Sequence, residues 1–215
     1  MTAEPQISFK IGLVGDPQIG KTSLMVKYVE GTFDDDYILT LGVNFMEKKL
    51  NIKDRVVVLN IWDLGGAKEF VTMLPLVCND AAAILFLFDL TRMPTLTSVK
   101  EWYKQAKKFN KGVLPFLIGT KFDLFVSLDE EVKKNTLQKA REYARVMKSP
   151  LCFSSARMSI NVKVIFKIVI AKILGLKTAW QEYHDIDQPI LEIEPYLTKG
   201  GDDKTKDKDV EEEQE

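Results

Sequence analysis

The chain has 215 residues, of which 46% are hydrophobic and 28% charged, so it is long enough for one domain with a sizeable core and is neither disordered nor fibrous in composition. The formal net charge of −1 hides an acidic end, because residues 199 to 215 hold four Lys and eight Asp or Glu, a net of −4 that leaves +3 for the rest. Neither value indicates a protein that binds nucleic acid.

No segment of the sequence is typical of a membrane anchor. The longest apolar run, residues 81 to 88, is far shorter than the roughly 20 residues that a membrane helix needs. The first residues are too polar for a signal peptide, and the last ones include no cysteine that could carry a prenyl group. Cys78 and Cys152 lie in apolar stretches without metal-ligand spacing and are expected to be reduced core thiols. We therefore expect a cytoplasmic protein without a direct membrane anchor.

The predicted elements alternate between strands and helices. Apolar runs predict strands over residues 9–15, 43–52, 55–63, 81–90, 112–120 and 150–155, and helical periodicity predicts helices over residues 21–30, 95–109, 130–147 and 160–174. Lys53 and Asp54 form the expected tight turn of an antiparallel hairpin. The pattern predicts an α/β fold with a mainly parallel six-stranded sheet, one antiparallel edge hairpin and helices on both faces.

Beyond about residue 176 the periodicity fades. QPILEIEPYL, residues 188 to 197, alternates apolar residues with polar ones and prolines, which suits an extended segment docked onto the domain or onto a partner. The remaining charged residues have too little apolar surface to offset their ordering entropy. We expect an N-terminal extension (1–8), one domain (9–175), a C-terminal extension (176–197) and a disordered tail (198–215).

A glycine-rich segment, GDPQIGKT, joins the first predicted strand to the first predicted helix at residues 15 to 22. It fits the pattern G-x-x-x-x-G-K-[ST] of a phosphate-binding loop. The backbone N–H groups of such a loop point at phosphate oxygens, and the helix N-terminus adds partial positive charge. Lys21 is expected to reach the β- and γ-phosphates, and the Thr22 hydroxyl to bind Mg²⁺.

Two later segments indicate which base the nucleotide carries. GTKFD, residues 119 to 123, places Asp123 after a strand, where its carboxylate can accept hydrogen bonds from the N1–H and the N2 amino group of guanine. Adenine lacks that pair of donors. Lys121 is expected to lie along the purine, and the Ala156 N–H in SSAR, residues 154 to 157, to bind the guanine oxygen. The sequence therefore predicts GTP and GDP as ligands.

These motifs, with Thr40 in YILTLGVNF and Asp63 in WDLGG, occur in the order and at about the spacing of the small Ras-like GTPases, over residues 9 to about 175. Within that superfamily, WDLGG, GTKFD and LPLVCNDAAAILFLFDLTR resemble the fungal septum-promoting GTPases of the septation-initiation and mitotic-exit networks. The resemblance implies a P-loop small GTPase fold and a monomeric switch that hydrolyses GTP to GDP with Mg²⁺.

The resemblance also implies roles for residues outside the phosphate-binding loop. Thr40 would close on Mg²⁺ when a γ-phosphate is present, and Asp63 would hold Mg²⁺ through water. The Gly66 N–H would contact the γ-phosphate, and the Phe33 ring would lie against the guanine. Loss of the γ-phosphate would release both loops, which is how such a protein reports its nucleotide state.

The expected site therefore draws on every motif. The residues expected to bind the nucleotide are Gly15, Asp16, Pro17, Gln18, Ile19, Gly20, Lys21, Thr22, Ser23, Phe33, Thr40, Gly66, Thr120, Lys121, Asp123, Ser155, Ala156 and Arg157. Catalysis is expected to depend on Lys21, Thr40 and Gly66, and Mg²⁺ is expected to bind Thr22, Thr40 and Asp63.

Three residues depart from the superfamily pattern. Thr120 stands where Asn is usual, and its shorter side chain is expected to brace the phosphate-binding loop less well. Pro17 replaces a glycine near the γ-phosphate, where its ring removes a donor, crowds the site and is expected to slow hydrolysis. Ala67 occupies the position of the glutamine that orients the attacking water, and a methyl group offers no hydrogen bond.

Ala67 leaves two interpretations open. In the first, hydrolysis depends on a GTPase-activating protein that inserts both an arginine and a glutamine, as activators of the septum-promoting and Rab-like families do. In the second, the protein stays loaded with GTP and acts as a binding module without turnover, whether the alanine is native or introduced. An ATP-using phosphotransferase is disfavoured by GTKFD, and a trafficking role of the Rab kind by the lack of C-terminal cysteines.

The resemblance further implies a location at the spindle pole body, reached through protein partners. These are an activating protein with a scaffold subunit and a downstream protein kinase. Residues 34 to 42 and 64 to 76, the two switch segments, are the expected partner surface. The second segment holds four apolar residues that suit core packing and partner contact equally well, namely Phe70, Val71, Met73 and Leu74.

Overall fold

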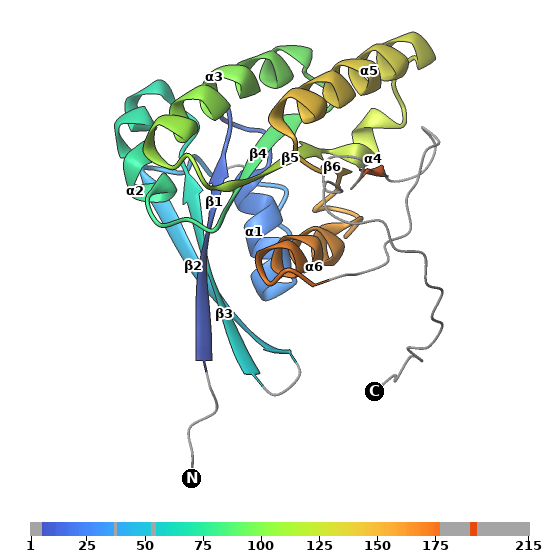
Figure 1. Ribbon diagram of the computed structural model, residues 1–215. Helices are drawn as coiled ribbons and strands as arrows, with labels where there is room; N and C mark the ends of the chain where they lie inside the picture. Colours follow the sequence, from blue (N-terminus) through green and yellow to red (C-terminus); the bar gives the residue numbers. More distant parts are fainter. Residues whose placement is uncertain (1–5, 37, 53–54, 177–189, 193–215) are drawn as a thin grey trace, which may run out of the picture.

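The computed structural model describes residues 6–36, 38–52, 55–176 and 190–192 (Figure 1). Within these residues, seven strands form one sheet in the order β2-β3-β1-β4-β5-β6-β7. They are β1 (Gln6–Val14), β2 (Val43–Ile52), β3 (Arg55–Leu64), β4 (Ala83–Asp89), β5 (Leu114–Thr120), β6 (Leu151–Phe153) and β7 (Leu191–Glu192). The five inner strands are parallel, and each edge strand pairs antiparallel with its neighbour.

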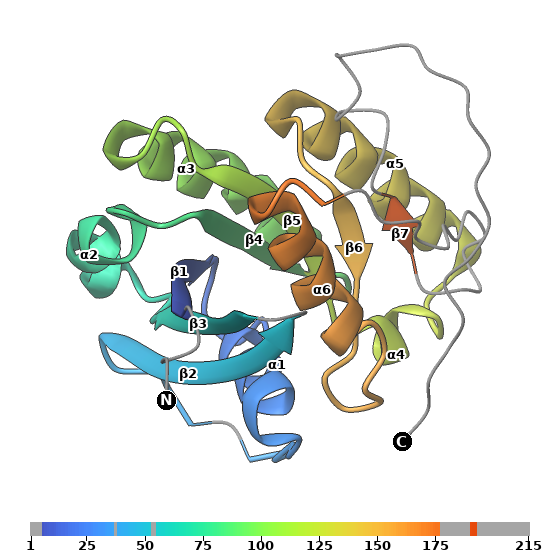
Figure 2. The same ribbon diagram turned by 60° about the horizontal axis from the view of Figure 1, so that its bottom comes forward.

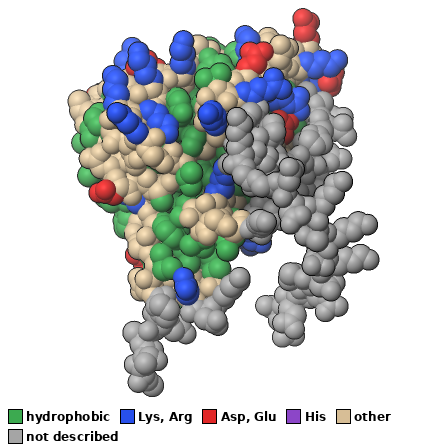
Figure 3. Space-filling view, in the orientation of Figure 1, with side chains coloured by type: hydrophobic (Ala, Val, Ile, Leu, Met, Phe, Trp, Pro, Cys, Tyr) green, Lys and Arg blue, Asp and Glu red, His purple; other side chains and the backbone are tan. Residues whose placement is uncertain are grey.

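Helices cover both faces of the sheet. They are α1 (Lys21–Glu30), the 3₁₀ helix η1 (Lys68–Met73), α2 (Leu74–Cys78), α3 (Met93–Phe109), α4 (Phe122–Phe125), α5 (Glu130–Met147) and α6 (Val162–Ile173). Figures 1 and 2 show α2, α3 and α5 on one face and α1 and α6 on the other. Lys and Arg side chains gather over α3 and α5 in Figure 3, so the outer faces of these helices are polar. None of the helices in the described residues is long and apolar enough to cross a membrane.

The sheet separates two hydrophobic cores. All seven residues of β4 are buried, and alternate side chains belong to opposite cores: Phe86 and Phe88 to the core under α3 and α5, Leu85 and Leu87 to the core under α1 and α6. A strand covered on both faces must be apolar throughout, as the uninterrupted run predicts. The predicted α/β fold with an antiparallel edge hairpin is therefore confirmed.

The two cysteines are free and buried, as predicted, one in each core. Burial raises the pKa of Cys78 to about 11 and that of Cys152 to about 12. Both thiols therefore stay protonated and unreactive near neutral pH.

The sheet differs from the prediction at both ends of the chain. β1 begins at Gln6, three residues before the expected start, because residues 6–8 continue the parallel register with Val56, Val57 and Val58 of β3. The predicted six strands become seven, since Leu191 and Glu192 add β7 beyond β6. The short elements η1, α2 and α4 were not predicted. The expected turn at Lys53–Asp54 and the tail 198–215 lie outside the described residues.

Candidate functional site

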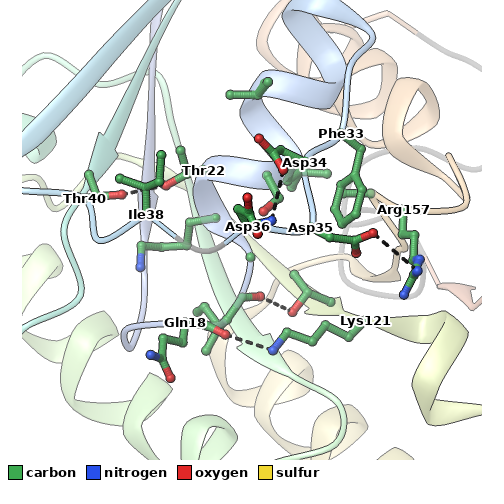
Figure 4. Close-up of a pocket in the computed structure, with 18 of the residues that line it drawn as sticks. Gln18, Thr22, Phe33, Asp34, Asp35, Asp36, Ile38, Thr40, Lys121 and Arg157 are labelled. Carbon is green, nitrogen blue, oxygen red and sulfur yellow. Dashed lines mark hydrogen bonds and ion pairs between the residues drawn. The ribbon is translucent and has the colours of Figure 1, made fainter.

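A cavity of about 640 Å³ lies where β1, β3, β5 and β6 end. The segments that follow these strands line it, together with the first turn of α1 and residues 32–36 and 38–40 (Figure 4). Loops at the carboxyl ends of parallel strands are the usual ligand-binding edge of an α/β sheet. The cavity is therefore the candidate functional site.

Most of the predicted site residues meet on the wall of this cavity. They are Pro17, Gln18, Ile19, Gly20, Lys21, Thr22, Ser23, Phe33, Thr40, Gly66, Thr120, Lys121, Asp123, Ala156 and Arg157. Gly15, Asp16, Asp63 and Ala67 do not line it. Ser155 also does not line the cavity; it is fully buried, and its hydroxyl accepts a hydrogen bond from the Met158 N–H at 3.0 Å. Ser154 is on the wall in its place.

The glycine-rich loop leads into the N-terminus of α1 at the cavity. Gly20 adopts a left-handed conformation (φ 87°) directly before α1, and no side chain caps the helix at this residue. The N–H groups of the first turn of α1 are therefore available to an anion, which the helix dipole also favours. At the other end of the loop, a Cβ on Gly15 would lie 2.4 Å from the Leu87 carbonyl oxygen, so only glycine fits there.

Lys21 places a buried positive charge in the cavity. Its side chain is 5% exposed, and Nζ donates a hydrogen bond to the Asp16 carbonyl oxygen at 2.9 Å. Burial lowers the pKa of Lys21, while the negative charges of Asp63 and Asp16 oppose that shift. An ammonium group that burial disfavours gains strongly from an added anion, which suits the predicted phosphate contact.

The three predicted metal ligands lie together beside Lys21. Thr22 Oγ1 donates a hydrogen bond to Asp63 Oδ2, and the Thr40 and Thr22 hydroxyl oxygens are 2.7 Å apart (Figure 4). Because the Thr22 proton points to Asp63, Thr40 must be the donor in the second bond. Thr40 lies 18 residues beyond Thr22 and belongs to the first switch segment, so this contact ties that segment to the phosphate-binding loop.

Asp63 fits a site for a cation. Its second oxygen, Oδ1, is buried and has no hydrogen-bond partner among the described residues. Burial raises the pKa of Asp63 to about 6, although the charge of Lys21 and the hydrogen bond from Thr22 oppose the rise. A buried acceptor without a partner, next to two hydroxyl oxygens, matches the hard oxygen ligands that Mg²⁺ prefers.

The predicted base-binding residues line the opposite end of the cavity. Lys121 adopts a left-handed conformation (φ 59°) before α4, and Asp123 follows in the first turn of that helix. The Thr120 hydroxyl lies 2.5 Å from the Ile19 carbonyl oxygen and 2.9 Å from that of Phe88. Thr120 is therefore long enough to reach the phosphate-binding loop despite its departure from the usual Asn.

A residue that the sequence analysis did not single out connects the two ends of the site. Asp89, 1% exposed, accepts hydrogen bonds at Oδ2 from Lys121 Nζ at 2.8 Å and from Arg92 Nε at 2.9 Å. Lys121 also donates to the Gln18 carbonyl oxygen at 2.9 Å, and Arg92 to that of Pro17 at 3.2 Å. One buried carboxylate thus orients two cations that both hold the phosphate-binding loop.

The environment of Asp89 favours its charged form. Burial alone would raise the pKa of Asp89, but hydrogen bonds from Lys121 and Thr91 outweigh burial and lower it. Asp89 lies at the end of a buried apolar strand, and the same position in the sequence pattern singled out Asp63 and Thr120.

Trp102 of α3 also holds the phosphate-binding loop, because its indole Nε1 donates to Asp16 Oδ1 at 2.9 Å. No local pattern marks that contact, which spans 86 residues.

The second switch segment begins against the phosphate-binding loop. The Gly65 N–H donates to the Gly42 carbonyl oxygen at 2.8 Å, which joins the two switch segments. A Cβ on Gly66 would lie 2.3 Å from the carbonyl carbon of Asp16, so residue 66 must be glycine for the backbones to approach this closely. Ala67 precedes η1 with extended backbone, while Lys68 and Glu69 are exposed and do not line the cavity.

Comparison with known proteins agrees with this geometry. The Ras family model matches residues 10–175. Septum-promoting GTP-binding protein 1 of Schizosaccharomyces pombe is 54% identical over 86% of this chain and 94% of that protein. GTP-binding protein YPTM1 of Zea mays is 30% identical over 84% of this chain and 85% of its own, and human Ras-related protein Rab-21 is 32% identical over 74% and 69%. The chain therefore belongs to the Ras family of small GTPases and, within it, to the septum-promoting type.

Proposed function

We propose that this protein is a GTP-controlled switch that promotes septation and mitotic exit through a downstream protein kinase. The contact of Thr22, Thr40 and Asp63 carries the switch part of the proposal, because it joins the cavity to the first switch segment and to the end of β3, from which the second segment follows. The septation role rests on the relative with 54% identity, whose name describes a septum-promoting protein. A location at the spindle pole body is proposed only from the resemblance of the motifs to the septum-promoting family.

The residues of this site suggest how the γ-phosphate is sensed. Lys21 and the N–H groups of the first turn of α1 would bind the phosphates. Thr22, Thr40 and Asp63 would hold Mg²⁺, which would supply positive charge beside them. Thr40 joins this cluster from the first switch, and Gly66 lines the cavity from the second. Loss of the γ-phosphate removes a contact from each segment, so both are released together.

Hydrolysis by the isolated protein is proposed to be slow. Ala67 carries no hydrogen-bonding side chain at the position of the water-orienting glutamine, and neither Lys68 nor Glu69 reaches the cavity wall. Pro17 lines the cavity and offers no N–H donor. We therefore propose that an activating protein, held by a scaffold subunit, positions the water and supplies charge from outside the chain. A GTP-loaded module without turnover is the alternative that Ala67 also supports.

Ala67→Gln is expected to raise the single-turnover rate of GTP hydrolysis by about tenfold, because a side-chain amide can then orient the attacking water. Hydrolysis is measured for both chains, alone and with the activating protein of the septation pathway. Ala67→Ser, which adds a hydroxyl that is too short to act as the amide does, is the matched control. Acceleration of the Ala67 chain by the activator supports the switch, whereas turnover by the glutamine variant alone would establish the GTP-loaded module.

The exposed apolar residues of the first switch segment suit a partner surface. Leu41 is 74% exposed without lining the cavity, and Met73 in the second segment is 41% exposed. Leu74, by contrast, is fully buried, and Phe70 and Val71 pack against the core. Of Phe70, Val71, Met73 and Leu74, Met73 is therefore the one proposed to contact partners.

Leu41→Asp is expected to weaken capture of the septation kinase by GTP-loaded protein by about tenfold, since a charge would be buried where an apolar side chain packs. Binding is measured with purified kinase, and GTP affinity is measured alongside. Val146→Asp on α5, at a valine 80% exposed, is the control. Equal kinase binding by the Leu41 variant and the unsubstituted chain would contradict the proposed surface.

A further inference from the structure

A short C-terminal strand completes the sheet beside β6. In β7, Glu192 pairs with Leu151 and Leu191 with Cys152, and the Phe153 N–H donates to the Ile190 carbonyl oxygen at 2.7 Å. Figure 2 shows β7 against β6, next to α5. Residues 190–192 thus supply the hydrogen-bond partners at an edge of β6 that would otherwise be open.

The side chains of this strand are anchored in both cores. Ile190 is fully buried in the core that holds Phe122, Phe125 and Phe153, while Leu191 is buried in the core on the other face, which holds Cys152. This alternation is the period of two that a strand between two cores requires. The segment is therefore an integral part of the sheet.

An ion pair fixes the end of the strand to α5. Arg141 donates from Nε at 2.8 Å and from Nη2 at 2.6 Å to Glu192 Oε1. The Glu192 side chain is 17% exposed and that of Arg141 34%, so the pair is only partly screened by water. Because the two side chains carry opposite charges, the ion pair can be broken by reversing either charge and restored by reversing both.

β6 pairs with β7 and is followed directly by residues 154–157 at the base-binding end of the cavity. Its last residue, Phe153, is fully buried and would have an unpaired N–H without Ile190. The next residue, Ser154, lines the cavity. Its backbone N–H donates to the Gly119 carbonyl oxygen at 2.7 Å, and its carbonyl oxygen accepts from the Phe122 N–H at 3.0 Å. Phe122 begins α4, which carries Asp123. Both base-binding loops therefore depend on the position of β6.

We propose that residues 190–192 act as a positioning strand that holds loops 119–123 and 154–157 in place and thereby slows the release of guanine nucleotides. The proposal rests on the assignment of the cavity to GTP and GDP. It makes the C-terminal segment a control point for nucleotide exchange, separate from the two switch segments.

The test is a charge exchange in the full chain. Arg141→Glu and Glu192→Arg each place two like charges in contact, and each is expected to speed GDP dissociation about tenfold, the effect of weakening one hydrogen bond to the base. The double variant restores the pair with its order reversed and is expected to return the rate to near that of the unsubstituted chain. Lys139→Glu, an exposed reversal on the same helix, is the control.

A second variant separates positioning from general stability. Val57→Ala removes buried methyl groups near the start of β3, in the pairing β1–β3 and away from the base-binding loops. At a similar loss of thermal stability, Val57→Ala is expected to leave GDP dissociation almost unchanged. Equal acceleration by Val57→Ala, or no rescue in the double variant, would overturn the positioning role. Failure of the unsubstituted chain to bind GDP would instead contradict the proposed function, and the inference with it.

Discussion

Lys21→Met is expected to weaken GDP binding by about a thousandfold. The ammonium group is buried at the N-terminus of α1, where screening by water is weak. One unit charge about 4 Å from another contributes roughly 4 kcal/mol at an effective dielectric of about 20, which corresponds to about three powers of ten in affinity. Methionine keeps the length of the apolar stem and removes only the charge, so the cavity should retain its shape.

The measurement is the dissociation constant of GDP in the presence of Mg²⁺, with thermal unfolding of the nucleotide-free protein alongside. Lys27→Met removes a lysine from the last turn of the same helix, off the cavity wall, and should bind GDP as the unsubstituted chain does. Because burial already disfavours the Lys21 charge, the substitution should not itself unfold the protein. A loss of less than tenfold in GDP affinity would show that Lys21 does not contact the phosphates.

Lys21 and Asp63 together explain why this site favours a charged ligand. Burial disfavours the charge of both groups, lowering the pKa of Lys21 and raising that of Asp63, although each partly offsets the other. A phosphate beside the first and a cation beside the second remove both penalties at once. Nucleotide and Mg²⁺ are therefore expected to bind cooperatively and to stabilise the folded chain through linkage.

The sequence was sufficient to predict the elements that have strong local patterns. β4 is an uninterrupted apolar run because it is covered on both faces, and α5 shows its amphipathic period over 18 residues. β7 could be expected only as an extended segment, since two residues form a strand only when β6 offers them an open edge. η1 and α4 are short helices of six and four residues, whose conformation depends on contacts with the rest of the fold.

Motifs predicted the site where chemistry requires a fixed spacing. The phosphate-binding loop and the placement of Asp123 follow from the order of residues along one turn, so Asp123 and residues 17–22 of the loop line the cavity, while Gly15 and Asp16 do not. The SSAR motif does not indicate which serine lines the cavity. In the structure Ser154 lines it, while Ser155 is buried and does not. The contact between Trp102 and Asp16 depends on the packing of α3 and leaves no local signal.

Asp89→Asn is expected to weaken GDP binding by roughly 30-fold, although Asp89 itself does not line the cavity. The asparagine has the same shape but no charge, so it holds Lys121 and Arg92 less firmly. Removing one member of a buried ion pair costs several kcal/mol, and we take about 2 kcal/mol because the two cations are one-third or more exposed. Asp129→Asn, at an exposed carboxylate before α5, is the control.

Because Asp89 is proposed to act through its two cations, its effect must depend on them. In a chain that already carries Lys121→Met and Arg92→Gln, Asp89→Asn is expected to change GDP affinity less than threefold, since nothing remains for the carboxylate to orient. Fully additive losses would show that Asp89 acts on nucleotide binding by another route. A non-additive result would mean that one carboxylate, at the end of β4, sets the geometry of both the phosphate-binding loop and the base-binding lysine.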